Sequence, residues 1–345
     1  MKRIIYIIIL LLPLVNGCTK TGTPPASEKF GRYIFFSQDV ETKASLVESA
    51  AAMDQFGVVG FKYDNSLEWN DVKGSATPNV FYDGTGKLVD TETLTCNTDR
   101  TATYEPLQGW RSNEKYSFFA YYPIGHDNVT FVKSDDGTPA IQYTMDVASP
   151  ASSMVDVMTA PAHIDKYWKS SSDNNTSNRD IRFQFAHRLS CLGLNLKNSS
   201  PAEIQIKSIA IIVNDIKYSN AIIPFDETKS EKYAGPAITG SIFSLTIREN
   251  EKYISSTGTE VSDKLIFIPQ IEDVSISLSI VYQRKRSGAE TYEEDEIFTT
   301  QSPVKTNLIK GIKHLIHLNF MDSNIYVMVG SGNWEDGPNV NHEFN

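Results

Sequence analysis

The sequence is poor in basic clusters, in cysteine and in long apolar runs, and each shortage excludes a class of protein. Lysine and arginine number 32 against 42 aspartates and glutamates, so the formal net charge is −10. An acidic chain without basic clusters argues against nucleic acid as a partner and against docking on anionic lipid head groups. After residue 17, no apolar run reaches the length of a membrane-spanning helix. These features indicate a water-soluble body rather than an integral membrane protein.

Motifs for catalysis are also absent from the sequence. It contains no Gly-x-Ser-x-Gly elbow, no phosphate-binding glycine loop and no Cys-x-x-Cys pair. His314 and His317 would share one face of a helix, but residues 312–320 alternate like a strand, which directs the two imidazoles to opposite sides. The acidic run at residues 293–296 lacks the spaced oxygen ligands and the glycine of a calcium loop, which favours a solvated turn. We therefore expect no enzyme activity, no cofactor and no metal site.

The amino terminus carries the clearest signal in the sequence. Lys2 and Arg3 precede a short apolar run, and Gly17 is followed by Cys18. This order is typical of a secretory signal peptide and resembles the lipobox of bacterial lipoproteins, in which cleavage occurs before a cysteine that is then acylated. The alternative is an ordinary signal peptide with an incidental cysteine. We expect residues 1–17 to be the signal peptide and Cys18 to be the lipidated first residue.

Lipidation of Cys18 predicts a protein tethered to a membrane outside the cytoplasm, because two or more acyl chains anchor a protein stably. Residues 18–29 are small, polar and proline-bearing, which indicates a flexible tether. The leader holds two basic residues and no acidic ones, so the remaining 328 residues carry a net charge of −12.

Two further cysteines, Cys96 and Cys191, leave two alternatives open. An oxidising compartment permits a disulfide between them. Two buried thiols are the simpler reading, which we favour because sequence gives no geometry for the pair.

Period-two alternation dominates the rest of the chain. Residues 274–282 alternate aliphatic or aromatic side chains with serine, while residues 264–268 are apolar on both faces and end at Pro269. Phe267 and Ile268 are therefore expected in a core. Helical periods are nearly absent, so we predict an all-β fold of two antiparallel β-sandwiches. The polar run at residues 169–179 suggests domains at residues 30–177 and 178–345.

The four tryptophans support two readings. Trp69, Trp110, Trp168 and Trp334 lie in or beside expected loops. Exposed indole rings stack on sugars, which would indicate a glycan-binding outer-membrane lipoprotein. Large aromatics are mostly buried, however, and they could equally close the ends of the sandwiches as core.

Five short motifs, in order along the chain, are similar to those of a known family. The motifs are Phe56-Gly57-Val58, the run from Tyr116 to Pro123, the run from Phe185 to Ser190, the run from Phe267 to Gln270 and the run from Gly332 to Gly337. With these motifs the chain resembles the fimbrillin family of Bacteroidales, the Mfa-like lipoproteins that build surface fimbriae, over nearly its whole mature length.

The resemblance implies two transthyretin-like β-sandwich domains and a stalk, tip or anchor subunit of a fimbria. The implied partners are other fimbrial subunits, joined by strand exchange, the outer membrane through the lipid, and host or bacterial surface ligands. The implied site is proteolytic: in this family a protease removes the lipidated segment, usually after an arginine. Here Lys43-Ala44 stands where that site belongs, between an expected first strand at residues 32–37 and one that starts at Phe56.

Overall fold

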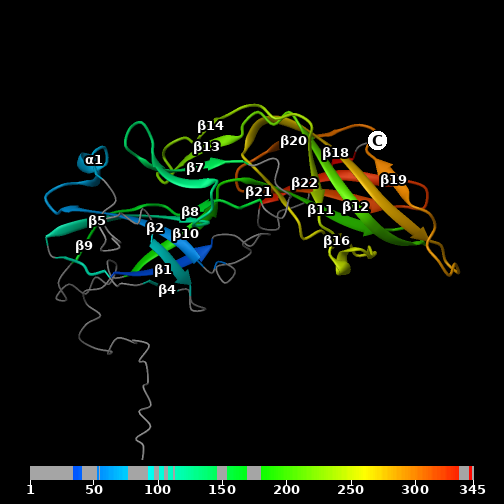
Figure 1. Ribbon diagram of the computed structural model, residues 1–345, viewed down its shortest axis with the longest axis horizontal. Helices are drawn as coiled ribbons and strands as arrows, with labels where there is room; N and C mark the ends of the chain where they lie inside the picture. The colour runs from blue at the N-terminus through cyan, green and yellow to red at the C-terminus, as the bar shows by residue number, and fades with distance from the viewer. Residues whose placement is uncertain are drawn as a thin grey trace, which may run out of the picture.

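The computed structural model describes residues 34–40, 53, 55–76, 92–96, 101–104, 108–111, 113–145, 154–168, 180–333 and 342–343. Over these residues the fold is almost entirely β, as the alternation predicted, with one four-residue α-helix, α1 (Trp69–Val72), and a short 3-10 helix at Glu249–Glu251. Two bodies of paired sheets lie end to end along the long axis of the molecule (Figure 1). No helix in the described ranges has the length and apolarity needed to cross a membrane.

The first body is built on a sheet that closes on itself. Its strand order is β2-β3-β4-β1-β10-β8-β5-β9, and an additional pairing of β2 with β5 completes a ring. The strands are β1 (Phe35–Val40), β2 (Gln55–Asp64), β3 (Glu92–Cys96), β4 (Thr101–Thr103), β5 (Glu114–Tyr122), β8 (Met158–Thr159), β9 (His163–Tyr167) and β10 (Asp180–His187).

The inside of this ring is filled by its own apolar cluster, here called the ring core. Alternate residues of each strand point inward, as a pleated sheet requires. The ring core consists of Ile34, Phe36, Met53, Phe56, Val58, Ala102, Tyr104, Trp110, Tyr116, Phe118, Ala120, Met158, Ala160, Ile181, Phe183 and Phe185.

A four-stranded sheet of order β14-β13-β7-β6 covers the outer face of the ring at β2 and β5. Phe61 on β2 and Phe119 on β5 point outward to it, and their rings meet Phe131 and Phe225 at centroid distances of 6.3 and 5.4 Å. This explains why residues 118–122 are apolar on both faces. The strands are β6 (Val129–Lys133), β7 (Pro139–Thr144), β13 (Asn220–Pro224) and β14 (Lys232–Ala234).

The second body is a sandwich of two sheets. One has the order β16-β11-β21-β22-β23, with β17 also on β11, and the other has the order β15-β12-β18-β19, with β20 also on β18. Their strands are β11 (Ser190–Asn198), β12 (Glu203–Asn214), β15 (Ser241–Leu245), β16 (Thr259–Glu260), β17 (Leu265–Phe267), β18 (Gln270–Lys285), β19 (Glu296–Thr299), β20 (Val304–Leu308), β21 (Ile312–Phe320), β22 (Ile325–Asn333) and β23 (His342–Glu343).

Two sequence predictions for the second body are confirmed. Along β18, Val274, Ile276, Leu278, Ile280 and Tyr282 are buried, and the positions between them are half-buried. Phe267 and Ile268 are both 0% exposed. One prediction needs correction: pairing is not purely antiparallel, because β1 runs parallel to β10, and β11 runs parallel to β21. Both parallel pairs join strands far apart in the chain, for which alternation within a strand carries no directional signal.

The sheets do not follow the expected division at residue 178. Strand β10 follows that position but lies in the ring, and β13 follows it but pairs with β7. A single buried apolar cluster also runs from Val59 in the first body to Phe320 in the second. A polar run predicts an exposed loop, but which sheet edge receives the next strand depends on long-range register. The division into two domains stays a prediction.

Candidate functional site

The candidate site is the position of β1 in the ring. Its six residues pair in parallel with residues 180–185 of β10, and two of them, Phe36 and Ser37, pair antiparallel with β4. We call the space that β1 fills between β10 and β4 the β1 groove. In Figure 1, β1 lies among the ring strands on the lower side of the first body.

The inner face of β1 reaches deep into the ring core. Phe36 is 1% exposed, and its ring lies 5.3 Å from Phe118, 5.6 Å from Phe183 and 5.7 Å from Tyr104, measured between centroids. Ile34 is 0% exposed and Gln38 is 1% exposed. Loss of β1 would therefore uncover an aromatic surface that is otherwise closed to water.

The start of β1 is held by hydrogen bonds from outside the strand ladder. The hydroxyl of Tyr104, directly after β4, donates to the carbonyl of Ile34 at 2.8 Å. The amide of Ile34 donates to the carbonyl of Gln108 at 2.9 Å. The amide of Gln108 in turn donates to the Tyr104 hydroxyl at 3.3 Å. Tyr104 and Gln108, the two residues that bind Ile34, are therefore hydrogen-bonded to each other.

The sequence located this strand approximately. It predicted a strand at residues 32–37, and β1 spans residues 35–40. Cys18, Lys43 and Ala44 lie outside the described residues, so lipidation and cleavage stay predictions. Cys191 is buried, but the side chain of Cys96 is not described, so their pairing stays open.

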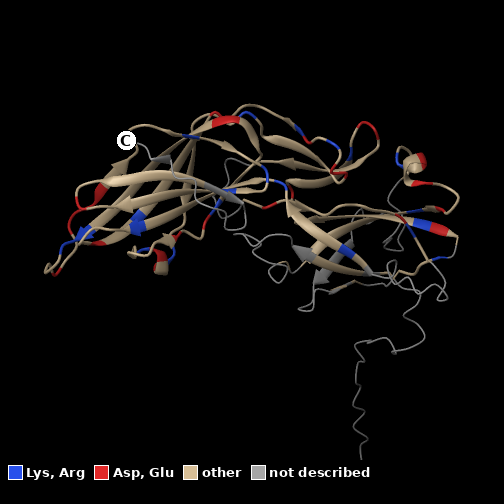
Figure 2. Ribbon diagram, turned by 180° about the vertical axis from the view of Figure 1, so that it is seen from behind, with Lys and Arg blue, Asp and Glu red and all other residues tan. Residues whose placement is uncertain are grey.

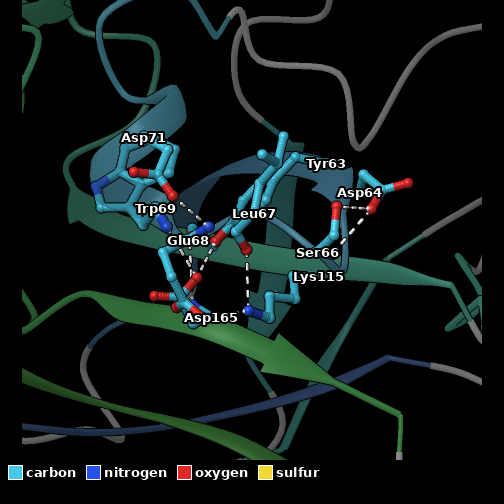
Figure 3. A network of polar contacts seen from close by, with 10 residues as sticks. Tyr63, Asp64, Ser66, Leu67, Glu68, Trp69, Asp71, Lys115 and Asp165 are labelled. Atoms are coloured by element: carbon cyan, nitrogen blue, oxygen red, sulfur yellow. Dashed lines mark hydrogen bonds and ion pairs between the residues drawn. The ribbon is translucent and has the colours of Figure 1, made fainter.

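A polar network closes the end of the first body where α1 lies, and it fixes the turn before α1 onto β5 and β9 (Figure 3). Asp165 is its centre: its Oδ1 accepts from the Tyr63 hydroxyl and from the Trp69 amide, both at 2.9 Å. Asp165 has φ of 55°, in the left-handed region that non-glycine residues seldom adopt.

Lys115 makes the second link in this network. Its Nζ donates to the Leu67 carbonyl at 2.9 Å and to Glu68 Oε1 at 2.6 Å. The bond from Lys115 lowers the pKa of the Glu68 carboxyl, and the same bond raises the pKa of Lys115. Burial raises the pKa of the Tyr63 phenol, so this group stays protonated and donates to Asp165. These bonds hold the loop before α1 against β5 and β9.

Two of the four tryptophans, Trp69 and Trp110, are core residues. Trp69 is 5% exposed and packs 4.9 Å from Phe61, while Trp110 is 6% exposed and packs 5.0 Å from Tyr116. Trp168 is half-buried, and Trp334 lies outside the described residues. For Trp69 and Trp110 the core reading is confirmed, and neither ring is available to stack on a sugar.

The two histidines lie on opposite faces of β21, as predicted. His314 is 1% exposed, and its Nε2 accepts from the amide of Ile309 at 3.3 Å. Burial lowers the pKa of His314 to about 4. His317 is half-buried on the other face, and its Nδ1 lies 3.2 Å from Nδ2 of Asn195. Burial lowers the pKa of His317 as well. In the described part of the chain, no three His, Cys, Asp or Glu residues gather as metal ligands do.

The sequence did not indicate two buried polar pairs near the junction of the two bodies. His187 Nδ1 lies 2.5 Å from Asp156 Oδ2, with both side chains 1% exposed, and Arg188 lies 2.8 Å from Glu231. The motif at residues 185–190 contains the two basic residues, but nothing in the sequence indicated their acidic partners. Elsewhere, positive and negative side chains are interspersed, mainly at turns and strand ends (Figure 2).

The sequence and the fold are both similar to those of known proteins. The sequence matches the profile of the family described as fimbrillin-like over residues 42–334. It is 23% identical over 268 residues to the fimbrium subunit Fim1C of Phocaeicola vulgatus, a match that covers 71% of this chain but only 65% of that protein. The chain thus spans somewhat less than two thirds of the length of this relative.

Two crystal structures share the architecture. A fimbrial protein from Bacteroides vulgatus superposes with a TM-score of 0.59 at 19% identity, covering 88% of this chain and 99% of that one. A candidate cell adhesion protein from Bacteroides ovatus superposes with a TM-score of 0.50 at 13% identity, covering 89% and 99%. Because the family profile extends over most of the sequence, the chain belongs to the fimbrillin-like family.

Proposed function

We propose that this protein is a structural and adhesive subunit of bacterial surface fimbriae, and that it joins its neighbours by exchange of a strand at the β1 groove. The observation that carries this proposal is the position of β1, which is inserted between β10 and β4 and supplies Phe36 to the ring core. Another strand inserted in that position would restore the pairings with β10 and β4.

Energetics favour refilling an emptied groove. The aromatic neighbours of Phe36 would lose their cover, and each large apolar side chain transferred from water contributes about 1.5–3 kcal/mol. The edge of β10 would also expose backbone groups over the six residues that now pair with β1. A strand from a second subunit offers both the hydrogen bonds and the apolar side chains.

Processing and anchoring complete the proposal. Acylation of Cys18 would tether the newly exported subunit to the outer membrane at the cell surface. Cleavage after Lys43 would cut between β1 and β2, since β2 begins at Gln55, and would release β1 together with the lipid. A subunit that keeps β1 would instead serve as an anchor or a tip, with host or bacterial surface ligands as partners.

A reversible lock on β1 tests this function. Ser37 of β1 and Arg182 of β10 are paired in register, so Ser37→Cys with Arg182→Cys should form a disulfide that ties β1 to β10. We expect oxidised cells of this double variant to lose detergent-resistant oligomer ladders, and we expect the ladders to return after reduction, because only then can β1 leave.

The matched control is a pair placed in the second body. Ala210 of β12 and Ser279 of β18 are also in register, so Ala210→Cys with Ser279→Cys adds a similar cross-link remote from β1. This variant and the wild type should form ladders under both conditions. Ladders of unchanged intensity from the oxidised β1 lock would exclude strand exchange at this groove.

A further inference from the structure

The β1 groove contains one residue that contacts both the backbone and an inward side chain of the strand inside it. Tyr104 donates its hydroxyl to the carbonyl of Ile34, and its ring lies 5.7 Å from that of Phe36. The two contacted positions are two residues apart, which is the repeat of one face of a strand. Tyr104 is itself 5% exposed, so it is held in place by the ring core.

The two walls of the groove differ in what they recognise. Along β10, backbone pairing extends over all six residues of β1, and backbone pairing by itself tolerates any sequence and any even shift in register. On the opposite wall, β4 pairs with Phe36 and Ser37, and Tyr104 and Gln108 bind the backbone of Ile34. Register is therefore determined at the start of the strand.

The position of Phe36 selects for an aromatic side chain. Three aromatic rings surround it at 5.3–5.7 Å, one in front from β5, one beside it from β10 and Tyr104 on the other side. A small side chain there would leave a cavity, and a charged one would be buried without a partner. At Ile34, by contrast, the hydrogen bonds with Tyr104 and Gln108 are made by backbone atoms and do not depend on the side chain, which is itself buried in the ring core.

We propose that Tyr104 sets the register of whichever strand occupies the β1 groove, and that the groove selects a segment with a large aromatic residue two positions after the residue bound by the Tyr104 hydroxyl. This inference rests on strand exchange as the proposed function, and it specifies the partner by its chemistry. The occupant is an extended segment of another fimbrial subunit, running parallel to β10, with an aromatic side chain in the Phe36 position.

The first test keeps β1 in its own chain. Hydrogen–deuterium exchange of residues 34–40 is followed in the full chain, in Tyr104→Phe and in Tyr253→Phe. The second variant removes the same atom from an exposed tyrosine of the second body, whose hydroxyl meets Gln205. We expect Tyr104→Phe to speed exchange of this segment roughly fivefold to tenfold, as loss of one hydrogen bond does, and Tyr253→Phe to leave it unchanged. Equal exchange in both variants would overturn the inference.

The second test supplies the strand in trans. The full chain is cleaved with trypsin, the trypsin is inhibited, and labelled peptides of residues 33–41 compete for the emptied groove. We expect the Phe36→Ala peptide to bind at least about tenfold more weakly than the native one, and the Glu41→Gln peptide, altered beyond the end of β1, to bind within about twofold. A groove with Tyr104→Phe should bind the native peptide more weakly by the same factor as in the exchange test.

The two tests distinguish failure of the Tyr104 inference from failure of strand exchange itself. If the cleaved chain binds the native peptide but neither Phe36→Ala nor Tyr104→Phe weakens binding, the inference is wrong and strand exchange stands. If no peptide binds while Tyr104→Phe still loosens β1 in the intact chain, strand exchange fails, and Tyr104 holds only its own strand. That result would overturn the selection of a partner.

Discussion

Phe118 and Phe119 are adjacent in β5 but belong to two different cores. The Phe118 ring lies 5.3 Å from Phe36 inside the ring, and the Phe119 ring lies 5.4 Å from Phe225 beneath the four-stranded sheet. One strand therefore packs against the inner face of β1 with one face and holds the covering sheet with the other. Because the two cores are separate, loss of β1 would leave the second core in place.

Alanine at each of these positions should separate the two roles. Both Phe118→Ala and Phe119→Ala empty a fully buried aromatic site, so each should lower the free energy of unfolding by about 3–5 kcal/mol in urea titrations. Only Phe118→Ala should also speed hydrogen exchange of residues 34–40 beyond the global effect. Faster exchange of β1 in both variants alike would mean that the two cores are not independent.

Phe267 tests the core of the second body. It is 0% exposed, and its ring meets Phe243 edge to face at 5.6 Å. We expect Phe267→Ala to lower the free energy of unfolding by about 3–5 kcal/mol. The control is Ile271, which lies on the next strand and is 75% exposed. Ile271→Ala should change the free energy of unfolding by less than about 0.5 kcal/mol. A loss below about 1 kcal/mol for Phe267→Ala would contradict the packing described.

Asp165 should be replaceable by asparagine but not by alanine. Its carboxylate accepts two hydrogen bonds and its φ is positive, and asparagine retains an acceptor oxygen and tolerates that backbone region. Alanine would leave the Tyr63 hydroxyl and the Trp69 amide without this acceptor, so Asp165→Ala should destabilise by about 1–3 kcal/mol in thermal or urea unfolding. Equal losses for the two variants would argue against the hydrogen bonds as the source of stability.

Stability should fall in mild acid because of His314. Its pKa is about 4 in the folded chain against 6.5 as its ordinary value, so the unfolded chain binds the proton first as the pH falls. Folding stability should therefore decrease from pH 6.5 to pH 4, by up to about 3 kcal/mol, and burial of His317 acts in the same direction.

The variant His314→Leu tests this assignment. The quantity to compare is the change in unfolding free energy with pH, not its absolute value, because the substitution also removes the acceptor for the Ile309 amide. Urea unfolding of wild type and variant is compared at pH 7, 6 and 5. We expect the variant to lose most of the decrease that the wild type shows. Parallel pH profiles would show that another group causes the acid sensitivity.

The sequence predicted the strands better than the sheets. Alternation along residues 274–282 and the two apolar faces of residues 264–268 were sufficient to place Phe267 and Ile268 in the core, because burial follows the period of a single strand. The return of β10 and β13 to the first body was not predictable, since the choice of a sheet edge depends on contacts between distant segments.

The candidate site was predictable only in part. The aromatic run near residue 35 indicated a strand with a buried face, and the resemblance to fimbrillins gave that strand a role. Tyr104 was not singled out, because its part in the site depends on the return of β4 to the side of β1, which no local pattern encodes. Asp165 and Asp156 were not predicted for the same reason: each forms hydrogen bonds with residues at least 31 positions away in the sequence.

Mass spectrometry of the amino terminus of this protein, taken separately from sheared fimbriae and from the outer membrane, is the decisive test of removal of β1 before assembly. We predict that the fimbrial fraction begins at Ala44 and lacks β1, while the membrane fraction includes chains that begin at acylated Cys18. Protein that is monomeric at the cell surface and begins uniformly at Cys18 would contradict it.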